Sequence, residues 1–554
     1  MILPRLKDAA RDGLLAWSRE EGLESPPPVS FAPAPAHVAE SDIAVAWPMA
    51  AAKALRRKPL DIAAAVSGRF AGFQAAAGLP ETDSAAHASP PGFLNLRLGP
   101  RTLAWNLLSL LRAPEDYGRF APAEPRDILL EFVSANPTGP VHLASSRAAT
   151  LGDSLARILR RLGHRVRTEY YVNDAGRQVK LLGLSVQARW DQAHGKDTPL
   201  PEDGYRGDYI ADIAKSAPPE AAGWTSGDFQ RFAVEAMLAQ HKTDMERFGV
   251  RFDRWFRESE LHDRRALDKT LARLRELGRV YDKDDAVWLG SSGEGSEDDK
   301  DRVLVRRDGL PTYFLADIAY HQDKLERGAR ELIDIWGADH HGYVPRMKEA
   351  IAALGCPKGT FHAIIHQLVH LFRGTEAVRM SKRAGEFITL RDLVDEVGVD
   401  ACRFFFAMRT PNAHMNFDLE LAKKQSNENP VFYAQYVHAR IASIFREAAA
   451  QGLSGNASSE ELAALQEPAE RGLLVKLVWF PEVLLLCERD LSPGALPTYL
   501  LELGALYHKF YELCRVLDPG DPARTRARLT LCAGVQAVIR SGLDLLGVSS
   551  PEQM

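Results

Sequence analysis

The chain has 554 residues, of which 45% are hydrophobic and 26% charged, and its 69 basic and 74 acidic side chains leave a formal net charge of −5. This composition excludes a largely disordered chain, and the length predicts three or four folded domains. The negative charge excludes a protein that holds nucleic acid by bulk positive charge, although a local basic face could still bind it.

The cysteines and the apolar stretches indicate the compartment. The five cysteines are scattered with no CxxC pair, which favours reduced thiols and a cytoplasmic protein. The N-terminal segment carries charged residues too early for a signal peptide. The longest apolar stretch, residues 473–487, is interrupted by Lys476 and Pro481, so no membrane span is expected.

Two segments rich in proline and alanine divide the first quarter of the chain. Residues 25–36 predict an extended loop, and residues 113–127 predict a linker. Between them lie a helical pattern around residues 50–60 and a strand-like run at residues 93–98. We therefore expect residues 1–118 to form a small α+β domain.

A different pattern follows the linker. Residues 128–133 predict a buried parallel strand, which leads through a turn-rich loop into a helix with apolar side chains at three- and four-residue spacing. Ser145 or Ser146 is the predicted cap of this helix, and a second strand is predicted at residues 165–172. Strand–helix–strand order predicts a Rossmann-like α/β domain over residues 119–420. Further strands are predicted at residues 332–336 and 363–371.

The remainder of the chain has a helical pattern. It is broken only by polar or proline-containing segments at residues 452–461 and 492–497. A C-terminal all-α bundle is therefore expected over residues 421–554.

Polar side chains gather where the first parallel strand ends. Residues 131–145 place a carboxylate, a hydroxyl, an amide and an imidazole directly before a helix N-terminus. Ligands bind at this edge of open α/β sheets, and helix N-termini bind anions. The segment contains neither GxGxxG nor a P-loop, so neither kind of nucleotide site is indicated. Taken alone, it could also be an ordinary tight turn.

A second polar segment is basic. Arg379, Lys382 and Arg383 lie beside Gly385 in a loop that could close on phosphates, where lysine provides a point charge. Taken alone, this segment could also be an ordinary solvated loop. When the two segments are taken together, a functional site is a better interpretation than two ordinary loops.

The pair resembles the two signature motifs of class I aminoacyl-tRNA synthetases, and the surrounding segments narrow the resemblance to arginyl-tRNA synthetase of the bacterial type. The resemblance extends over essentially the whole chain. The segments that carry it are EFVSANPTGPVH (131–142), EYYVNDAGRQ (169–178), DGLPTYFLADIAYH (308–321), WGADHHGYV (336–344), RMSKRAG (379–385) and SNENPVFYAQYVHARI (426–441).

The resemblance implies ATP-dependent attachment of L-arginine to tRNA(Arg) through an arginyl-adenylate, with Mg²⁺ as cofactor, in a cytoplasmic monomer. A guanidinium needs a carboxylate in fork geometry, and the family's arginine site corresponds to Tyr313 and Asp317. The remaining predicted arginine-binding residues are Glu131, Ser134 and Asn136 at the α-amino and carboxylate end, and His340 near the side chain.

The same resemblance implies the position of ATP. The nucleotide would lie over the helix that begins near Ser145, with its phosphates between His142 and Lys382. The predicted nucleotide-binding residues are His142, Ala144, Ser145, Arg379, Met380 and Lys382, and the predicted catalytic residues are His142, Ser381 and Lys382. No general base and no resident metal site in the protein are expected.

The chain departs from the family at one motif. The usual His-x-Gly-His becomes His142-Leu143-Ala144-Ser145, which adds a methyl group and removes an imidazole. This substitution predicts weak or altered use of ATP. The alternative function is accordingly a weakened paralog with a binding or regulatory role; a plain nucleotidyltransferase of the same superfold fits the helical C-terminus less well.

Contact with tRNA should be local because the chain is acidic. Tyr507, Tyr511 and Arg515 could stack on anticodon bases, although helical spacing also allows core packing. Arginines near the active-site mouth and in the helical part are further candidates: Arg157, Arg160, Arg161, Arg165, Arg167, Arg524, Arg526 and Arg528. The histidines at positions 362, 366 and 370 recur every four residues but fall in a strand pattern with no thiol or carboxylate nearby, so zinc binding is not expected.

Overall fold

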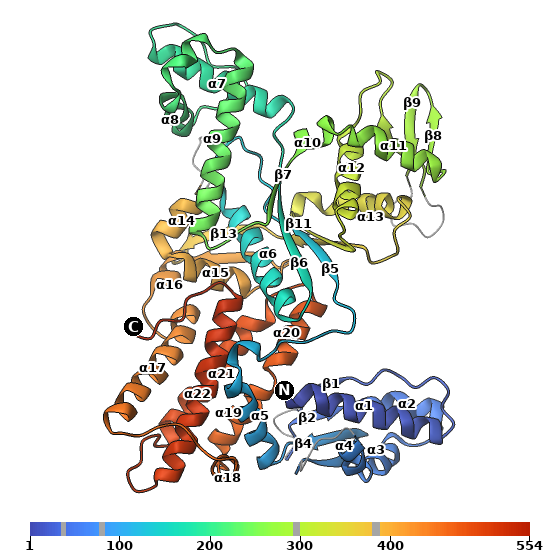
Figure 1. Cartoon of the computed structure of the whole chain (residues 1–554), viewed down its shortest axis with the longest axis vertical. Coiled ribbons are helices and arrows are strands. Elements are labelled where there is room, and N and C mark those ends of the chain that lie inside the picture. Colours follow the sequence, from blue (N-terminus) through green and yellow to red (C-terminus); the bar gives the residue numbers. More distant parts are fainter. Residues whose placement is uncertain (35–39, 77–82, 292–299, 379–387) are drawn as a thin grey trace.

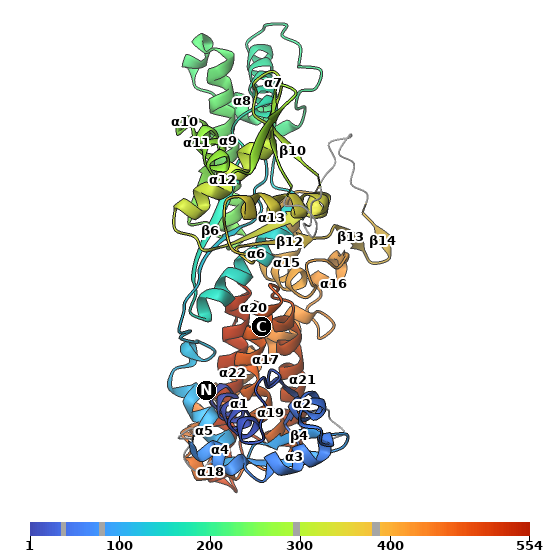
Figure 2. The same ribbon diagram turned by 90° about the vertical axis from the view of Figure 1, so that its right-hand side faces the viewer.

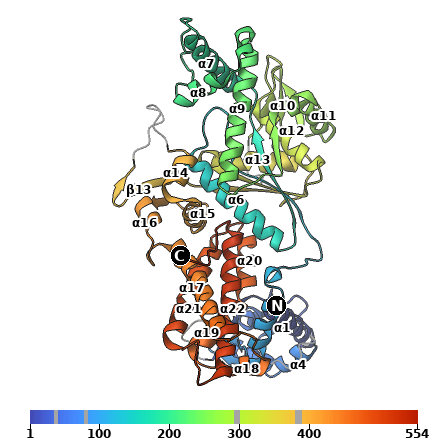
Figure 3. The same ribbon diagram turned by 60° about the vertical axis from the view of Figure 1, so that its left-hand side comes forward.

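A computed structural model describes residues 1–34, 40–76, 83–291, 300–378 and 388–554. The molecule is elongated, with the N-terminal elements beside the C-terminal helices at one end (Figure 1). A parallel sheet lies in the middle, and two inserted lobes extend from it at the other end. The views in Figure 2 and Figure 3 show the same order along the long axis.

The first part of the chain is a small α+β unit. Its antiparallel sheet has the strand order β1-β2-β4-β3, and α1 buries Leu6, Leu14 and Trp17. The strands are β1 (Phe31–Pro33), β2 (Ile43–Val45), β3 (Ala85–Ser89) and β4 (Phe93–Arg97). The helices are α1 (Ile2–Glu20), α2 (Trp47–Leu55), α3 (Pro59–Ser67), α4 (Phe70–Ala76) and α5 (Pro100–Arg112), and a short 3₁₀ turn, Pro114–Asp116, follows.

Two expectations for this unit are corrected. The segment predicted as an extended loop contains the short strand β1. The single helical pattern around residues 50–60 is two helices, because Arg56 adopts a left-handed conformation and Lys58 is extended before Pro59. The strand predicted at residues 93–98 is confirmed as β4.

The predicted Rossmann-like parallel sheet is confirmed. Its strand order is β12-β11-β5-β6-β7, and every neighbouring pair is parallel. The first unit is β5, helix α6 and β6, in the predicted order. The strands are β5 (Asp127–Glu131), β6 (Arg165–Val172), β7 (Arg254–Arg257), β11 (Glu331–Gly337) and β12 (Phe361–His366).

Helix α6 (Leu143–Arg161) starts earlier than predicted. Its N-cap is His142, so neither Ser145 nor Ser146 caps it. The apolar face is as predicted, with Leu151, Leu155 and other residues buried against the sheet. The earlier start places Ser145 within the first turn.

Two insertions interrupt the sheet. Between β6 and β7 lie α7 (Arg177–Ala193), α8 (Asp208–Ser216), a 3₁₀ turn (Pro219–Gly223) and α9 (Ser226–Arg247). Between β7 and β11 lie α10 (Glu258–Asp263), α11 (Ala266–Glu276), β8 (Val280–Lys283), β9 (Ala286–Leu289), β10 (Arg302–Val305) and α12 (Tyr313–Glu326). A 3₁₀ turn (Ala338–Tyr343) and α13 (Val344–Ala353) follow β11. Thr312 caps α12 through its side chain, which accepts from the Leu315 N–H.

The segment after β12 links the sheet to the helices. The single strand predicted at residues 363–371 is two strands, since Gln367 and Leu368 separate β12 from β13 (Val369–Arg373). Strands β14 (Glu376–Ala377) and β15 (Met415–Asp418) complete a small sheet, and the helices here are α14 (Leu390–Val397), α15 (Val399–Ala407) and α16 (Leu419–Lys423). The buried Arg403 of α15 pairs with Asp153 of α6 and donates to the carbonyl of Leu546, the C-cap of the last helix, so it joins these three helices.

The C-terminal part is all-helical, as predicted. Asn429 caps its first long helix, and Pro430 occupies the first turn. The helices are α17 (Pro430–Ala450), α18 (Ser459–Ala463), α19 (Pro468–Val478), α20 (Phe480–Arg489), α21 (Ala495–Leu513) and α22 (Pro522–Leu545). Within the described ranges, no helix is both long and apolar enough to cross a bilayer.

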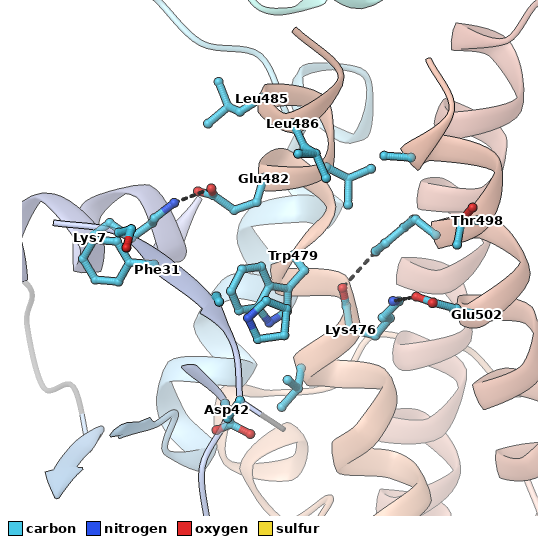
Figure 4. A pocket seen from close by; sticks show the side chains of 18 of the residues that line it. Lys7, Phe31, Asp42, Lys476, Trp479, Glu482, Leu485, Leu486, Thr498 and Glu502 are labelled. Carbon is cyan, nitrogen blue, oxygen red and sulfur yellow. Dashed lines mark hydrogen bonds and ion pairs between the residues drawn. The ribbon is translucent and has the colours of Figure 1, made fainter. Parts of the chain in front are cut away.

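A groove of about 850 Å³ separates the N-terminal unit from α19, α20 and α21 (Figure 4). The Trp479 ring lies at its centre, and Lys7 pairs with Glu482 across it. Arg471 pairs with Asp42 at 2.6 Å, beside the groove. These ion pairs attach the N-terminal unit to the helical part.

Candidate active site

A cavity of about 590 Å³ opens at the carboxyl edge of the parallel sheet, where β5 and β11 end and α6 begins. Helix α12 and the turn after β11 complete its walls. Six of the predicted site residues line it: Glu131, Ser134, Ala144, Ser145, Asp317 and His340. The structure therefore brings together side chains that are more than 200 positions apart in the chain, at the edge where open α/β sheets bind ligands.

A fully buried lysine lies at the base of the cavity. Lys324 Nζ contacts Glu131 Oε2 at 2.6 Å and Asp334 Oδ1 at 2.8 Å. Burial alone would raise the pKa of Asp334, but the charges of Lys324 and His321 hold it below its usual value. The second oxygen of Asp334 faces His321 Nε2 at 2.9 Å. Both oxygens of Glu131 are also occupied, since Ser134 donates to Oε1 at 2.7 Å.

Asp317 differs from Glu131 and Asp334 in its partners. Among the described residues it forms no ion pair with lysine or arginine, and the Tyr343 hydroxyl donates to its Oδ2. Burial raises the pKa of Asp317 to about 6, and the Tyr343 hydrogen bond opposes this rise. A cationic group entering the cavity would favour the ionised form of Asp317.

The loop after β5 has an unusual backbone. Val133 and Ser134 have positive φ values of 72° and 42°, and the Ser134 N–H donates to the Phe132 carbonyl at 3.1 Å across Val133. A positive φ is costly for a β-branched residue. The turn directs the Ser134 hydroxyl at Glu131, where it also accepts from the Tyr171 N–H at 3.1 Å.

The start of α6 forms another wall of the cavity. Ala144 and Ser145 line it, and His142 is exposed at the N-cap without a side-chain capping bond. The first N–H groups of a helix have no partner within the helix, so this terminus suits an anion. Thr389 forms a β-bridge with His142. The predicted Arg379, Met380, Ser381 and Lys382 lie outside the described residues.

Of the predicted site residues that the structure describes, three are not part of the cavity lining: His142, at the N-cap of α6, Tyr313 and Asn136. Tyr313 is 78% exposed at the start of α12 and is not part of the lining. Asn136 is exposed, and its amide donates to Gln178 Oε1 at 2.9 Å. His340 does line the cavity, on the exposed turn after β11, close to Asp339.

Several site residues were missed from the sequence. His321 and Lys324, which were missed, follow the predicted Asp317 along one face of α12 at four- and three-residue spacing, together with Tyr320, whose hydroxyl donates to Glu169 at 2.7 Å. A polar face on the buried side of a helix was the available signal. The sequence around Tyr343 and around Asp334 has no comparable pattern that would have marked either residue as part of a site.

The predicted tRNA residues differ in exposure. Tyr507 is fully buried in the core, whereas Tyr511 is 37% exposed and Arg440 lies 4.7 Å from its ring centroid. Arg515 is exposed.

Most of the candidate basic residues are engaged within the protein. Arg157 pairs with Asp153, and Arg160 pairs with Asp253. The remaining partners are Ser541 for Arg161, Asp127 for Arg165, the Arg327 carbonyl for Arg167, Asp521 for Arg524, Glu461 for Arg526 and Glu470 for Arg528. These bonds leave fewer arginines available to RNA than the sequence indicated.

The described residues contain no group of three or more histidine, cysteine, aspartate or glutamate side chains placed to hold a metal ion.

Comparisons with known proteins agree with this fold. Residues 107–215 match the family model "tRNA synthetases class I (R), catalytic domain", and residues 434–554 match "DALR anticodon binding domain". The solved Thermus thermophilus arginyl-tRNA synthetase shares the fold with a TM-score of 0.78 and 24% identity, covering 100% of both chains. The fold and the matched family models are those of a class I aminoacyl-tRNA synthetase.

Sequence relatives define the family. An arginine–tRNA ligase of Elusimicrobium minutum is 49% identical, covering 95% of this chain and 96% of the relative, and one of Bacillus licheniformis is 41% identical over the full length of both. A solved structure from Campylobacter jejuni is 36% identical, with a TM-score of 0.73, covering 82% of this chain and 100% of that one. The chain belongs to the arginine–tRNA ligase family.

Replacing Lys324 tests the charge arrangement at the base of the cavity. Lys324→Met leaves two buried carboxylates without their lysine, so the free energy of unfolding should fall by about 3–5 kcal/mol. Denaturant unfolding at neutral pH measures this loss. Combining Lys324→Met with Asp334→Asn removes one of the two buried carboxylate charges. The double variant should therefore recover part of the lost free energy of unfolding. A Lys324→Met protein as stable as the parent would contradict the assignment.

Proposed function

We propose that the chain attaches L-arginine to tRNA(Arg) in an ATP-dependent reaction, through an arginyl-adenylate. The observation that carries this proposal is Asp317, a carboxylate without a lysine or arginine partner among the described residues, in a cavity whose two buried acids, Glu131 and Asp334, are already paired with Lys324. A guanidinium supplies the missing positive charge and can donate two parallel hydrogen bonds.

The cavity supports one orientation of the substrates. The arginine side chain extends toward Asp317 and Tyr343, and its α-amino and carboxylate groups lie near Glu131 and Ser134, with Asn136, Tyr313 and His340 at the rim. ATP lies over the start of α6, so that its phosphates face the helix N-terminus at His142.

The reaction then requires positioning rather than a general base. The arginine carboxylate attacks the α-phosphorus and pyrophosphate departs. The tRNA ribose hydroxyl then attacks the adenylate carbonyl, the bond from this carbonyl to the phosphate oxygen breaks, and AMP leaves with the hydroxyl proton on its phosphate. His142 and the N-terminus of α6 hold phosphate oxygens, and Ser381 and Lys382, with Arg379 and Met380, would close over the departing pyrophosphate. Mg²⁺ would neutralise part of the phosphate charge.

The other parts of the chain would bind tRNA. We assign residues 1–118 to tRNA contact, residues 119–420 to catalysis and residues 421–554 to the anticodon, with Tyr511 and Arg515 as exposed contacts. Tyr507 would support the Tyr511 ring from the core, at a centroid distance of 6.3 Å. A cytoplasmic monomer is consistent with this assignment.

Aminoacylation of tRNA(Arg) with labelled arginine tests the function directly. The purified chain should charge tRNA(Arg) only when ATP and Mg²⁺ are both present, and arginine should not be replaceable by lysine. Failure to charge tRNA(Arg) under these conditions would contradict the proposal.

The protonation of Asp317 should control arginine affinity. Because its pKa is raised to about 6, Asp317 loses its charge as the pH falls through 6, and arginine should bind about tenfold more weakly at pH 5 than at pH 7. Calorimetric titration with arginine measures this. In Tyr343→Phe the opposing hydrogen bond is absent, so the midpoint should move to higher pH. In Asp317→Asn the dependence should disappear, and a parent affinity that does not change with pH would refute the assignment.

The Ala144 and Ser145 substitutions should slow use of ATP. Both side chains line the cavity, and a lost transition-state donor costs about 3–4 kcal/mol. The double variant Ala144→Gly/Ser145→His should therefore raise kcat for aminoacylation at least tenfold, with Ala144→Gly alone as the matched control. An unchanged kcat would show that the motif does not limit the rate. The relatives are named as ligases and give no support to a binding or regulatory paralog.

A further inference from the structure

A fully buried arginine lies near the start of α6. Arg147 occupies the second turn of this helix, and its guanidinium donates to three backbone carbonyls. These are the carbonyls of Gln367 at 2.8 Å and of Thr410 and Ala413 at 2.9 Å each. Among the described residues Arg147 pairs with no carboxylate. A buried cation without a counter-ion is costly, and an aliphatic side chain would fill the same space, so the carbonyl contacts and the charge need an explanation.

The three carbonyls belong to two segments that are distant from α6 in the sequence. Gln367 lies between β12 and β13, whereas Thr410 and Ala413 lie in the loop before β15. The two segments also bond to each other, since the Gln367 N–H donates to the Pro411 carbonyl at 2.9 Å. One guanidinium therefore holds α6, the β12–β13 connection and the loop before β15 together.

The start of α6 has contacts on the other side of the basic segment as well. The β12–β13 connection continues through β13 and β14 toward residues 379–387. After that segment, Thr389 forms a β-bridge with His142, the N-cap of α6, and the Leu390 N–H donates to the Val141 carbonyl at 2.8 Å. The chain before and the chain after residues 379–387 are thus both attached to the start of α6.

The charge of Arg147 acts on the cavity. Burial lowers the pKa of Arg147 to about 10, so the guanidinium is still protonated at neutral pH. Burial also lowers the pKa of His366, a residue of the cavity lining, to about 4, and the Arg147 charge contributes to this decrease. Because buried charges are screened less than exposed ones, Arg147 adds positive potential at the end of α6 where the helix dipole is already positive.

We propose that Arg147 is a positioning residue for adenylate formation: it fixes the start of α6 against the β12–β13 connection and the loop before β15, and it adds a positive charge behind the helix terminus that would face the ATP phosphates. The inference rests on the proposed function, because it assumes that ATP lies over the start of α6. Arg147 is not part of the cavity lining, so it would act through the helix and not by touching the nucleotide.

Two substitutions of Arg147 in the full chain test this role by aminoacylation kinetics. Arg147→Met removes the charge and the carbonyl bonds, so KM for ATP should rise about tenfold. Arg147→Lys keeps the charge but lacks the planar fork that reaches the three carbonyls, so KM for ATP should rise about threefold. KM for arginine should change less than twofold in both variants, because the carboxylates beneath the cavity belong to other elements.

Adenosine, which has no phosphate, distinguishes positioning of the phosphates from a general loosening of the cavity. Its inhibition constant in competition with ATP should stay within about twofold of the parent value in both variants. An inhibition constant that rises by the same factor as KM for ATP would overturn the proposal. Equal KM values for ATP in the parent and in Arg147→Met would overturn it as well.

Arg403→Lys is the matched control. Arg403 is also fully buried and donates to backbone carbonyls, but it contacts α6 at Asp153, away from the helix start. This variant should have a lower Tm than the parent and a KM for ATP within about twofold of the parent value. If KM for ATP rises as much as in Arg147→Lys, any weakening of α6 has this effect and the specific role of Arg147 is wrong. If thermal unfolding shows that Arg147→Met does not fold, Arg147→Lys decides by the same criteria.

The parent enzyme separates this inference from the proposed function. If the parent charges tRNA(Arg) and both Arg147 variants retain its KM for ATP, the function stands and the role of Arg147 is wrong. If the parent does not charge tRNA(Arg), the function itself fails.

Discussion

The buried Lys324 ammonium is the interaction on which the rest of the site depends. It contacts carboxylates from two neighbouring strands, Glu131 at 2.6 Å and Asp334 at 2.8 Å, and its own helix packs over both. Burying three charges is costly unless each is paired and hydrogen-bonded. Here Ser134 and His321 satisfy the remaining oxygens, so α12, β5 and β11 are joined at one point beneath the cavity.

This pairing determines which acid is left for a ligand. Glu131 and Asp334 are occupied by Lys324, and Glu169 is held by two hydrogen bonds from Arg327 at 2.7 and 2.8 Å. Among the described residues, the Asp317 carboxylate, one helical turn from His321, accepts a hydrogen bond from the Tyr343 hydroxyl and pairs with no lysine or arginine. Asp339, the remaining acid of the lining, is exposed beside His340, so Asp317 is the acid that we propose for a cationic substrate.

Sequence patterns predicted the sheet well and the side-chain partners poorly. The strand at residues 165–172 was predicted to the residue, because β-branched and aromatic residues alternate with polar ones between a glycine and an Asn-Asp turn. Residues 363–371 were predicted as one strand, although they span most of β12 and the start of β13, because periodicity did not mark the break at Gln367 and Leu368.

Side chains are harder to predict because helical spacing does not say which face is buried. Tyr313 and Asp317 lie four apart on α12, yet Tyr313 is exposed, and the hydroxyl beside Asp317 comes from Tyr343 on another element. Helical spacing also did not show which of Tyr507 and Tyr511 faces the solvent. Tyr507 is buried in the core, whereas Tyr511 is exposed. Lys324 was missed because a lysine in a polar helix is ordinarily solvated.

The most direct measurement compares arginine with citrulline, an isostere that lacks the positive charge, as ligands of the parent and of Asp317→Asn. If Asp317 is the acid left for the guanidinium, the preference of the parent for arginine should fall about 10- to 100-fold in the variant, while citrulline affinity changes little. An equal preference for arginine in both proteins would contradict this account of the site.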